Sequence, residues 1–325
     1  MREWNLRHMT WPEINVAVKE RRVVLIPVGA IEQHGPHLPI DMDNLAVEAI
    51  CERAGRKGSD LLLVAPPIHY GFNEHNMDFP GTVTAEPFTF ASYCRDVAHS
   101  FGRMGFQRVI FVNGHGSNAH LLELAARQAT LLNKAWVASL SHWDLVREEF
   151  AKIRESVFPG GVAHACELET SIYMHLAPGR VRMDKIRTGV REQGKYFWED
   201  LMGGSPVKFT DWRSKATKSG VGGDPTVATA EKGRKVIAAA VDALIDVARE
   251  FRDLYWGERT NLCVGEPATP EKGSRAGGRR RGGKIGRMAP RPRARPTPRE
   301  SATDREITEQ GNGGRRPAGP RGRRP

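Results

Sequence analysis

The chain has 325 residues, 39% of them hydrophobic, and a formal net charge of +11. This length allows one large domain or two small ones. Residues 265–325 are rich in Arg, Pro and Gly and carry all of the excess charge, so the rest of the chain is neutral overall. No stretch approaches the ~18 continuous apolar residues of a membrane span, and the N-terminus lacks a signal-peptide core, so we expect a cytoplasmic protein.

The basic segment divides the chain into two predicted parts. A sequence so charged and so poor in aliphatic residues cannot bury enough apolar surface to offset the entropy of ordering it. We therefore predict a folded domain over residues 1–262 and a disordered tail over residues 263–325. The tail could contact nucleic acid or another polyanion. It contains no aromatic residue for base stacking, however, which favours a solvated appendage.

Within residues 1–262, apolar β-branched runs alternate with stretches of helical periodicity. Continuous apolar runs are typical of strands that are buried on both faces of a parallel sheet. The alternation predicts an α/β fold with a mainly parallel sheet covered by helices on both faces. The predicted strands cover residues 21–30, 61–66, 108–113 and 135–140, and the predicted helices cover 44–57, 87–104, 118–133, 144–155, 166–176 and 226–255.

The first polar cluster directly follows the strand predicted at 21–30. It contains Glu32, His34, His37, Asp41 and Asp43 within the sequence EQHGPHLPIDMD. Imidazole and carboxylate are ligands suited to zinc, manganese or iron. Residues two apart in extended backbone face the same side, so one centre could take both Glu32 and His34. As a group these side chains favour a metal site, whereas His37 and Asp41 individually favour structural roles.

Two further polar clusters follow later predicted strands. The loop NGHGSN after strand 108–113 contains His115, with two glycines that allow a tight turn. The stretch HACELETS begins at His164, a candidate general acid or base, and one of Glu167 and Glu169 could complete a metal shell. Ligands of open α/β sheets bind at the carboxyl ends of the strands, so we expect these clusters to meet there. A loop at 69–82, with Glu74 and His75, could shape the pocket.

Motifs of several other enzyme classes are missing from the sequence. There is no GxSxG elbow for serine catalysis and no Rossmann fingerprint for a dinucleotide. The four cysteines, Cys51, Cys94, Cys166 and Cys263, are widely spaced and form no CxxC pair, which predicts reduced thiols.

The quoted stretches resemble the creatininase (creatinine amidohydrolase) family. The matching segments are PVGAIEQHGPHLPIDMD, FPGT, VNGHGSN and HACELETS, in the family's order, and the resemblance extends over about residues 5–255. It implies a three-layer α/β/α fold with a parallel-rich sheet. It also implies one or two divalent metal ions (Zn, Mn or Fe), a small-molecule amide substrate, and homo-oligomers that are often hexamers.

The resemblance also assigns roles to individual residues. It implies that Glu32, His34, Asp43 and His115 are metal ligands, with Asp43 as the bridge, and that His164 is catalytic. Glu169 matches a family glutamate and becomes a further ligand or proton carrier.

One position departs from the family pattern. Creatininases carry an acidic ligand two residues after the NGH histidine, where this chain has Ser117. We therefore expect Glu169 to complete a second metal site. We predict a metal-dependent hydrolase of a non-peptide or cyclic C–N bond, similar to creatinine amidohydrolase. The alternatives are a formamidopyrimidine-nucleotide deformylase, a mycofactocin-type peptidase, and a polyanion- or RNA-binding protein that acts through the tail.

Overall fold

The structure is a computed structural model that describes residues 2–132, 134–255 and 257. The predicted tail at 263–325 and Cys263 lie outside the described residues. The other three cysteines, Cys51, Cys94 and Cys166, are buried free thiols. None of the described helices is long and apolar enough to cross a membrane.

The four predicted strands form one parallel sheet, which confirms the predicted fold class. The strands are β1 (Val23–Val28), β2 (Leu62–Val64), β3 (Arg108–Asn113) and β4 (Trp136–Ser141), in the order β2-β1-β3-β4. β2 is shorter than predicted and ends before Pro66 and Pro67, neither of which has an N–H for the ladder. Val28 pairs with Asn113 and Asn113 pairs with Ser141, so three strands end at the same level.

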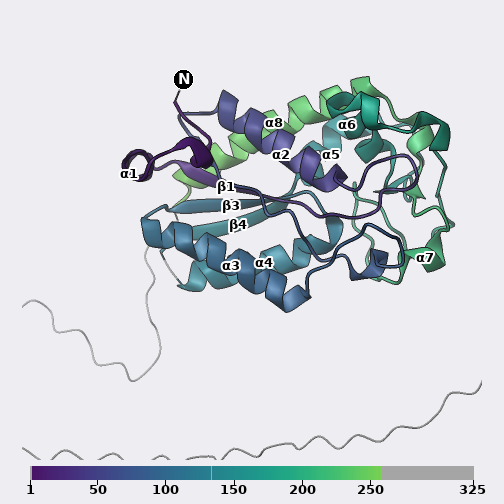
Figure 1. The fold of residues 1–325 in the computed structure, drawn as a ribbon, viewed down its shortest axis with the longest axis horizontal. Helices are drawn as coiled ribbons and strands as arrows, with labels where there is room; N and C mark the ends of the chain where they lie inside the picture. The colour runs from purple at the N-terminus through teal and green to yellow at the C-terminus, as the bar shows by residue number, and fades with distance from the viewer. Residues whose placement is uncertain (1, 133, 256, 258–325) are drawn as a thin grey trace, which may run out of the picture. The chain divides into compact units, whose positions relative to one another are not determined.

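Helices cover both faces of this sheet (Figure 1). Along β1, Val23 and Leu25 face a core shared with α2 (Met42–Lys57), α6 (Glu167–Leu176) and α8 (Ala230–Asp253). The alternate residues Val24, Ile26 and Val28 face a second core with α3 (Pro87–Met104) and α4 (Ala119–Leu132). Because both faces are covered, every residue of β1 is buried, as the continuous apolar run predicts.

Several predicted helix bounds are wrong. The helix predicted over 144–155 is a 3-10 helix, His142–Val146, followed by the short α5 (Arg147–Ala151). The last helix begins at Ala230 rather than at 226, because Pro225–Val227 forms a separate 3-10 turn and the Thr229 side chain caps α8.

The region 178–224, which the sequence left without a prediction, wraps around the carboxyl ends of the strands. It contains the short helix α7 (Arg213–Ala216) and the strand β6 (Gly222–Gly223), which pairs antiparallel with β5 (Val162–His164). In Figure 1, α7 lies at the end of the sheet opposite α1 (Trp11–Lys19). The loops that follow the strands gather at this same end.

Candidate metal centre

The structure brings all five predicted ligands together in a buried cluster. They come from the loop after β1, the first turn of α2, the loop after β3 and the first turn of α6, and each is at most 7% exposed. The residues are Glu32, His34, Asp43, His115 and Glu169.

One group of ligand atoms is formed by Glu32, Asp43 and His115. The His115 Nδ1 atom lies 2.8 Å from Glu32 Oε1 and 3.1 Å from Asp43 Oδ2. A second group is formed by His34, Asp43 and Glu169. The His34 Nε2 atom lies 3.3 Å from Asp43 Oδ1 and 3.7 Å from Glu169 Oε1. Each group could hold a metal ion, and Asp43 gives one carboxylate oxygen to each.

The histidine rings are oriented by hydrogen bonds to main-chain carbonyls. His34 Nδ1 lies 3.3 Å from the Glu32 carbonyl oxygen, and His115 Nε2 lies 3.0 Å from the Phe72 carbonyl oxygen. This network assigns one ring N–H to those atoms, so the nitrogen that faces the carboxylates can carry a second proton or offer its lone pair to a metal ion. Metal-binding histidines are typically held in this way.

Asp43 and Glu169 are both placed by helix starts. Asp43 lies in the first turn of α2, where the helix dipole favours a negative charge. The turn lies close to Gly114, since a Cβ atom there would be 2.5 Å from the Asp43 carbonyl oxygen. Glu169 is the third residue of α6, and its Oε2 accepts from the main-chain N–H of Cys166 at 3.3 Å. The other Glu169 oxygen therefore stays available to face His34.

The charges of the cluster are coupled through its buried ion pairs. Burial lowers the pKa of His115, but Glu32 and Asp43 outweigh this effect and raise the pKa to about 10. Burial raises the pKa of Glu32, but the charge of His115 outweighs it and lowers the pKa to about 2. The carboxylates thus remain anionic at neutral pH, and protons on the histidines balance them. A divalent cation can take the place of those protons.

Two atoms of the cluster are buried without a hydrogen bond to any described residue. They are His34 Nε2 and Asp43 Oδ2, both of which face other ligand atoms at ion-pair distance. Unsatisfied buried polar atoms are costly unless another partner completes them. Nitrogen and carboxylate donors in this arrangement fit divalent zinc, manganese or iron.

His164 lies beside the cluster and faces Glu32. Its Nε2 atom is 2.7 Å from the Gln33 carbonyl oxygen, so we assign the proton to Nε2. The Nδ1 atom then has a free lone pair, 3.7 Å from Glu32 Oε1. Burial, against the attraction of Glu32, lowers the pKa of His164 well below its usual value. The neutral ring could accept a proton in the site, or bind a metal together with Glu32 and His34.

A match to known proteins identifies the family of this chain. A family model described as "Creatininase: Creatinine amidohydrolase" matches residues 7–248. The chain belongs to the creatininase family. It is therefore a creatininase-family amidohydrolase with buried His, Glu and Asp candidates for a metal site.

Curated relatives and a solved structure agree with this membership. A mycofactocin precursor peptide peptidase of Mycobacterium ulcerans (strain Agy99) is 32% identical over 245 residues, which cover 72% of this chain and 83% of the relative. Creatinine amidohydrolase of Pseudomonas putida is 27% identical over 266 residues, covering 74% and 95%. A solved structure described as "Creatininase Mn" has a TM-score of 0.66 at 24% identity, covering 78% and 100%, and supports the fold.

Several side chains around this creatininase-family site were not singled out from the sequence. The Asn76 amide donates to Glu32 Oε2 and the Gln33 amide donates to Asn76 Oδ1 at 3.1 Å. Arg213 and His142 are also buried at this end of the sheet. Their only sequence signal is a position after a strand or within a loop, which many ordinary polar residues share.

Ser117, the departure from the family pattern, is not in either ligand group. Its hydroxyl lies 3.4 Å from Nδ1 of His75, whose ring stacks near His115 at 6.3 Å between ring centres. The loop at 69–82 thus reaches the site through His75 and Asn76. Its other candidate, Glu74, is exposed.

Three polar residues near the motifs have other partners. The Glu167 carboxylate pairs with the Lys232 ammonium group. His37 Nε2 lies 2.9 Å from the Thr170 hydroxyl oxygen, and Asp41 accepts from the Tyr173 hydroxyl at 2.8 Å. None of the three belongs to the ligand groups found among the described residues.

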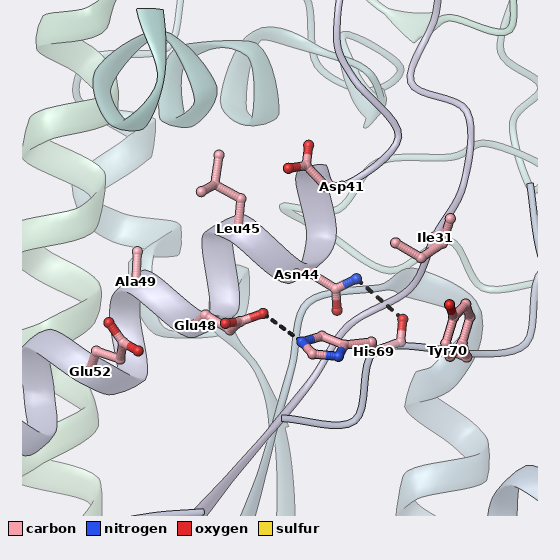
Figure 2. Close-up of a pocket in the computed structure, with 9 residues that line it drawn as sticks. All are labelled: Ile31, Asp41, Asn44, Leu45, Glu48, Ala49, Glu52, His69 and Tyr70. Atoms are coloured by element: carbon pink, nitrogen blue, oxygen red, sulfur yellow. Dashed lines mark hydrogen bonds and ion pairs between the residues drawn. The ribbon is translucent and has the colours of Figure 1, made fainter. Parts of the chain in front are cut away.

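A separate surface hollow of about 490 Å³ lies along the outer side of α2 (Figure 2). It contains none of the five ligand candidates. Glu48 in this hollow pairs with His69 at 3.0 Å, and the Asn44 amide donates to the main-chain carbonyl of His69 at 3.2 Å. The hollow is therefore distinct from the buried cluster of candidate ligands.

Proposed function

We propose that this chain hydrolyses an amide C–N bond with two divalent metal ions held at the carboxyl end of the sheet. The observation that carries the proposal is the position of Asp43. Its two carboxylate oxygens face two histidines that belong to different ligand groups. A carboxylate in this position is suited to bridge two metal ions.

Each metal position has three candidate ligands from the chain. Glu32, Asp43 and His115 would hold one ion, and His34, Asp43 and Glu169 would hold the other. Glu169 would then supply the carboxylate ligand that Ser117 cannot provide. Ions bound there would supply a Lewis acid for the amide carbonyl and would make water a nucleophile at neutral pH. Manganese is a candidate because a structurally similar creatininase is described with it.

His164 is suited to move the proton during this reaction. Water adds to the carbonyl carbon, the C–N bond breaks, and a proton must pass from the water to the leaving nitrogen. The His164 Nδ1 lone pair faces the cluster while Nε2 is fixed on the Gln33 carbonyl. We therefore assign the proton transfer to Nδ1, with Glu169 acting as a ligand rather than as the carrier.

The substrate class has two candidates. The resemblance to creatinine amidohydrolase favours a cyclic or non-peptide amide, and a formylated pyrimidine nucleotide is a variant of that class. The similarity to a mycofactocin precursor peptide peptidase favours a peptide bond. Both candidates need the same attack on an amide carbonyl. We also expect the protein to form a homo-oligomer, as the family resemblance implies.

Metal counting in ligand variants tests the proposal. We expect two metal ions per purified chain after loading with zinc or manganese, one in Glu32→Gln or Glu169→Gln, and none in Asp43→Asn, because only Asp43 serves both groups. Elemental analysis gives the counts, and hydrolysis is assayed with creatinine, a formylated pyrimidine nucleotide and short peptides.

Asp41→Asn is the matched control for this series. Asp41 lies two residues from Asp43 but accepts from Tyr173 and belongs to neither ligand group. We expect it to keep both ions and full turnover. Equal metal content in the Asp43→Asn and Asp41→Asn proteins would contradict the bridging role, and turnover by metal-stripped Glu32→Gln protein would contradict the metal-dependent mechanism.

A further inference from the structure

Arg213 is a buried cation beside the proposed active site that the hydrolysis mechanism does not use. It opens α7 and is 8% exposed. Its Nη1 and Nη2 atoms donate to the two carboxylate oxygens of Glu199 at 3.1 and 3.0 Å. The pair is bidentate, so the guanidinium plane is fixed by this carboxylate.

The Glu199 carboxylate serves two guanidinium groups. Arg191 Nη2 donates to Glu199 Oε2 at 2.6 Å, the same oxygen that accepts from Arg213. Arg191 and Glu199 are 38% and 42% exposed, so solvent screens their pair, whereas the buried Arg213 also interacts with the site carboxylates Glu32 and Glu169. Cations bound to Glu32 and Glu169 would take up the charge of those carboxylates, so Arg213 could then pair with an anionic ligand.

One edge of the Arg213 guanidinium carries a donor that such a ligand could satisfy. Its Nε atom is buried and has no hydrogen-bond partner among the described residues. The bonds to Glu199 occupy the Nη1 and Nη2 end, which leaves the Nε–H and an adjoining Nη N–H along one side. These two donors form the planar fork that matches a carboxylate.

This guanidinium is close to the proposed proton carrier. The pairing of β5 with β6 places Gly222 opposite His164. A Cβ atom on Gly222 would lie 2.9 Å from Arg213 Nη1 and 3.5 Å from His164 Cβ. The two side chains therefore lie on the same side of Gly222, separated by about the space of one methyl group. Helix α7 also contacts the 3-10 turn Glu74–Asn76, which supplies the Asn76 bond to Glu32.

We propose that Arg213 binds a carboxylate of the amide substrate, so that the enzyme selects amides with a free carboxylate next to the scissile bond. The C-terminal residue of a peptide has this chemistry, whereas a neutral cyclic amide would leave Arg213 without an anion. The inference rests on the proposed amide hydrolysis and narrows its substrate class.

A matched pair of peptides tests this selectivity. Acetylglycylphenylalanine and its C-terminal carboxamide differ only at the terminal group, which is an anionic carboxylate in one and a neutral carboxamide in the other. Binding of each to the metal-loaded full chain is measured by titration calorimetry, and hydrolysis is measured from the released phenylalanine or its amide. We expect the acid to bind at least about 10-fold more tightly, because a charge-assisted bond replaces a neutral one.

Two variants remove the carboxylate site in different ways. Arg213→Met deletes the guanidinium, and Gly222→Ala displaces it while leaving ordinary contact with His164. We expect each to weaken binding of the acid by about 10- to 100-fold and to leave carboxamide binding and metal content unchanged. Arg191→Met is the control, since Arg191 shares Glu199 but is more exposed, and it should keep the preference for the acid.

The outcomes separate this inference from the proposed function. A wild-type protein that does not distinguish the two peptides overturns the inference, as does an equal loss for both peptides in both variants, which would indicate a structural role for Arg213. If neither peptide nor any other amide is hydrolysed while the acid preference in binding depends on Arg213, the proposed function fails and the carboxylate site stands.

Discussion

The three histidines of the centre each use one ring nitrogen on a main-chain carbonyl and turn the other toward carboxylates. The carbonyls belong to Glu32, Gln33 and Phe72. The sequence predicted which histidines take part, but it could not predict which nitrogen faces the site. That choice depends on where the carbonyls lie after folding, and Phe72 is 43 residues from its partner His115.

A substitution of His164 separates proton transfer from metal binding. We expect His164→Ala to lower kcat by about 100-fold or more while both metal ions remain bound, because the Nδ1 atom carries the proton rather than the metal. Steady-state kinetics and elemental analysis on the same protein give the two readouts.

His37→Asn is the control for that substitution, because His37 is a buried histidine outside the ligand groups. We expect it to retain its metal and its turnover. If the His164→Ala protein loses a metal ion together with turnover, His164 is a ligand, and our assignment of its role is wrong.

At the scale of elements, the first turns of α2 and α6 place the two carboxylates that complete the metal groups. The helix over residues 166–176 could be predicted from its periodicity, and α6 indeed covers Glu167–Leu176. The residue pattern left open which of its two early glutamates faces the site, and only the family resemblance favoured Glu169. Glu169 faces His34, whereas Glu167 is fully buried against Lys232 of α8, since the packing of α6 on α8 decides which partner each one meets.

The Glu167–Lys232 pair should anchor α6 against α8. We expect Lys232→Met to lower the free energy of unfolding by about 3 kcal/mol, because it leaves a buried carboxylate without its cation. Denaturant unfolding of the metal-free protein measures the change without a contribution from bound metal.

Lys235→Met provides the comparison on the same helix. Lys235 lies 3.9 Å from Glu231 in an exposed pair, and its loss should change the stability by less than about 0.5 kcal/mol. Equal losses of unfolding free energy in the two variants would show that the buried pair stabilises α6 no more than the exposed pair does.

For the whole molecule, the five ligand candidates and Arg213 all lie between residues 32 and 213, within the described part of the chain. We expect removal of residues 263–325 to leave the metal content and the amide hydrolysis unchanged. Elemental analysis and the peptide assay on the truncated and full-length proteins check this. If truncation removes the only measurable activity, the alternative of a polyanion-binding protein acting through its tail is favoured instead.

The sequence by itself determined the α/β class, the four parallel strands and the family. Buried strands and ligand motifs can both be recognised from short, continuous runs of residues. The sequence also named Glu32, His34, Asp43, His115 and Glu169, through the resemblance of their motifs to the family. Tertiary structure alone decided which Asp43 oxygen faces which histidine. It also decided that Arg213 lies beside His164, because β5 and β6 pair residues 58 positions apart. Contacts between such distant segments depend on packing and leave no local signal in the sequence.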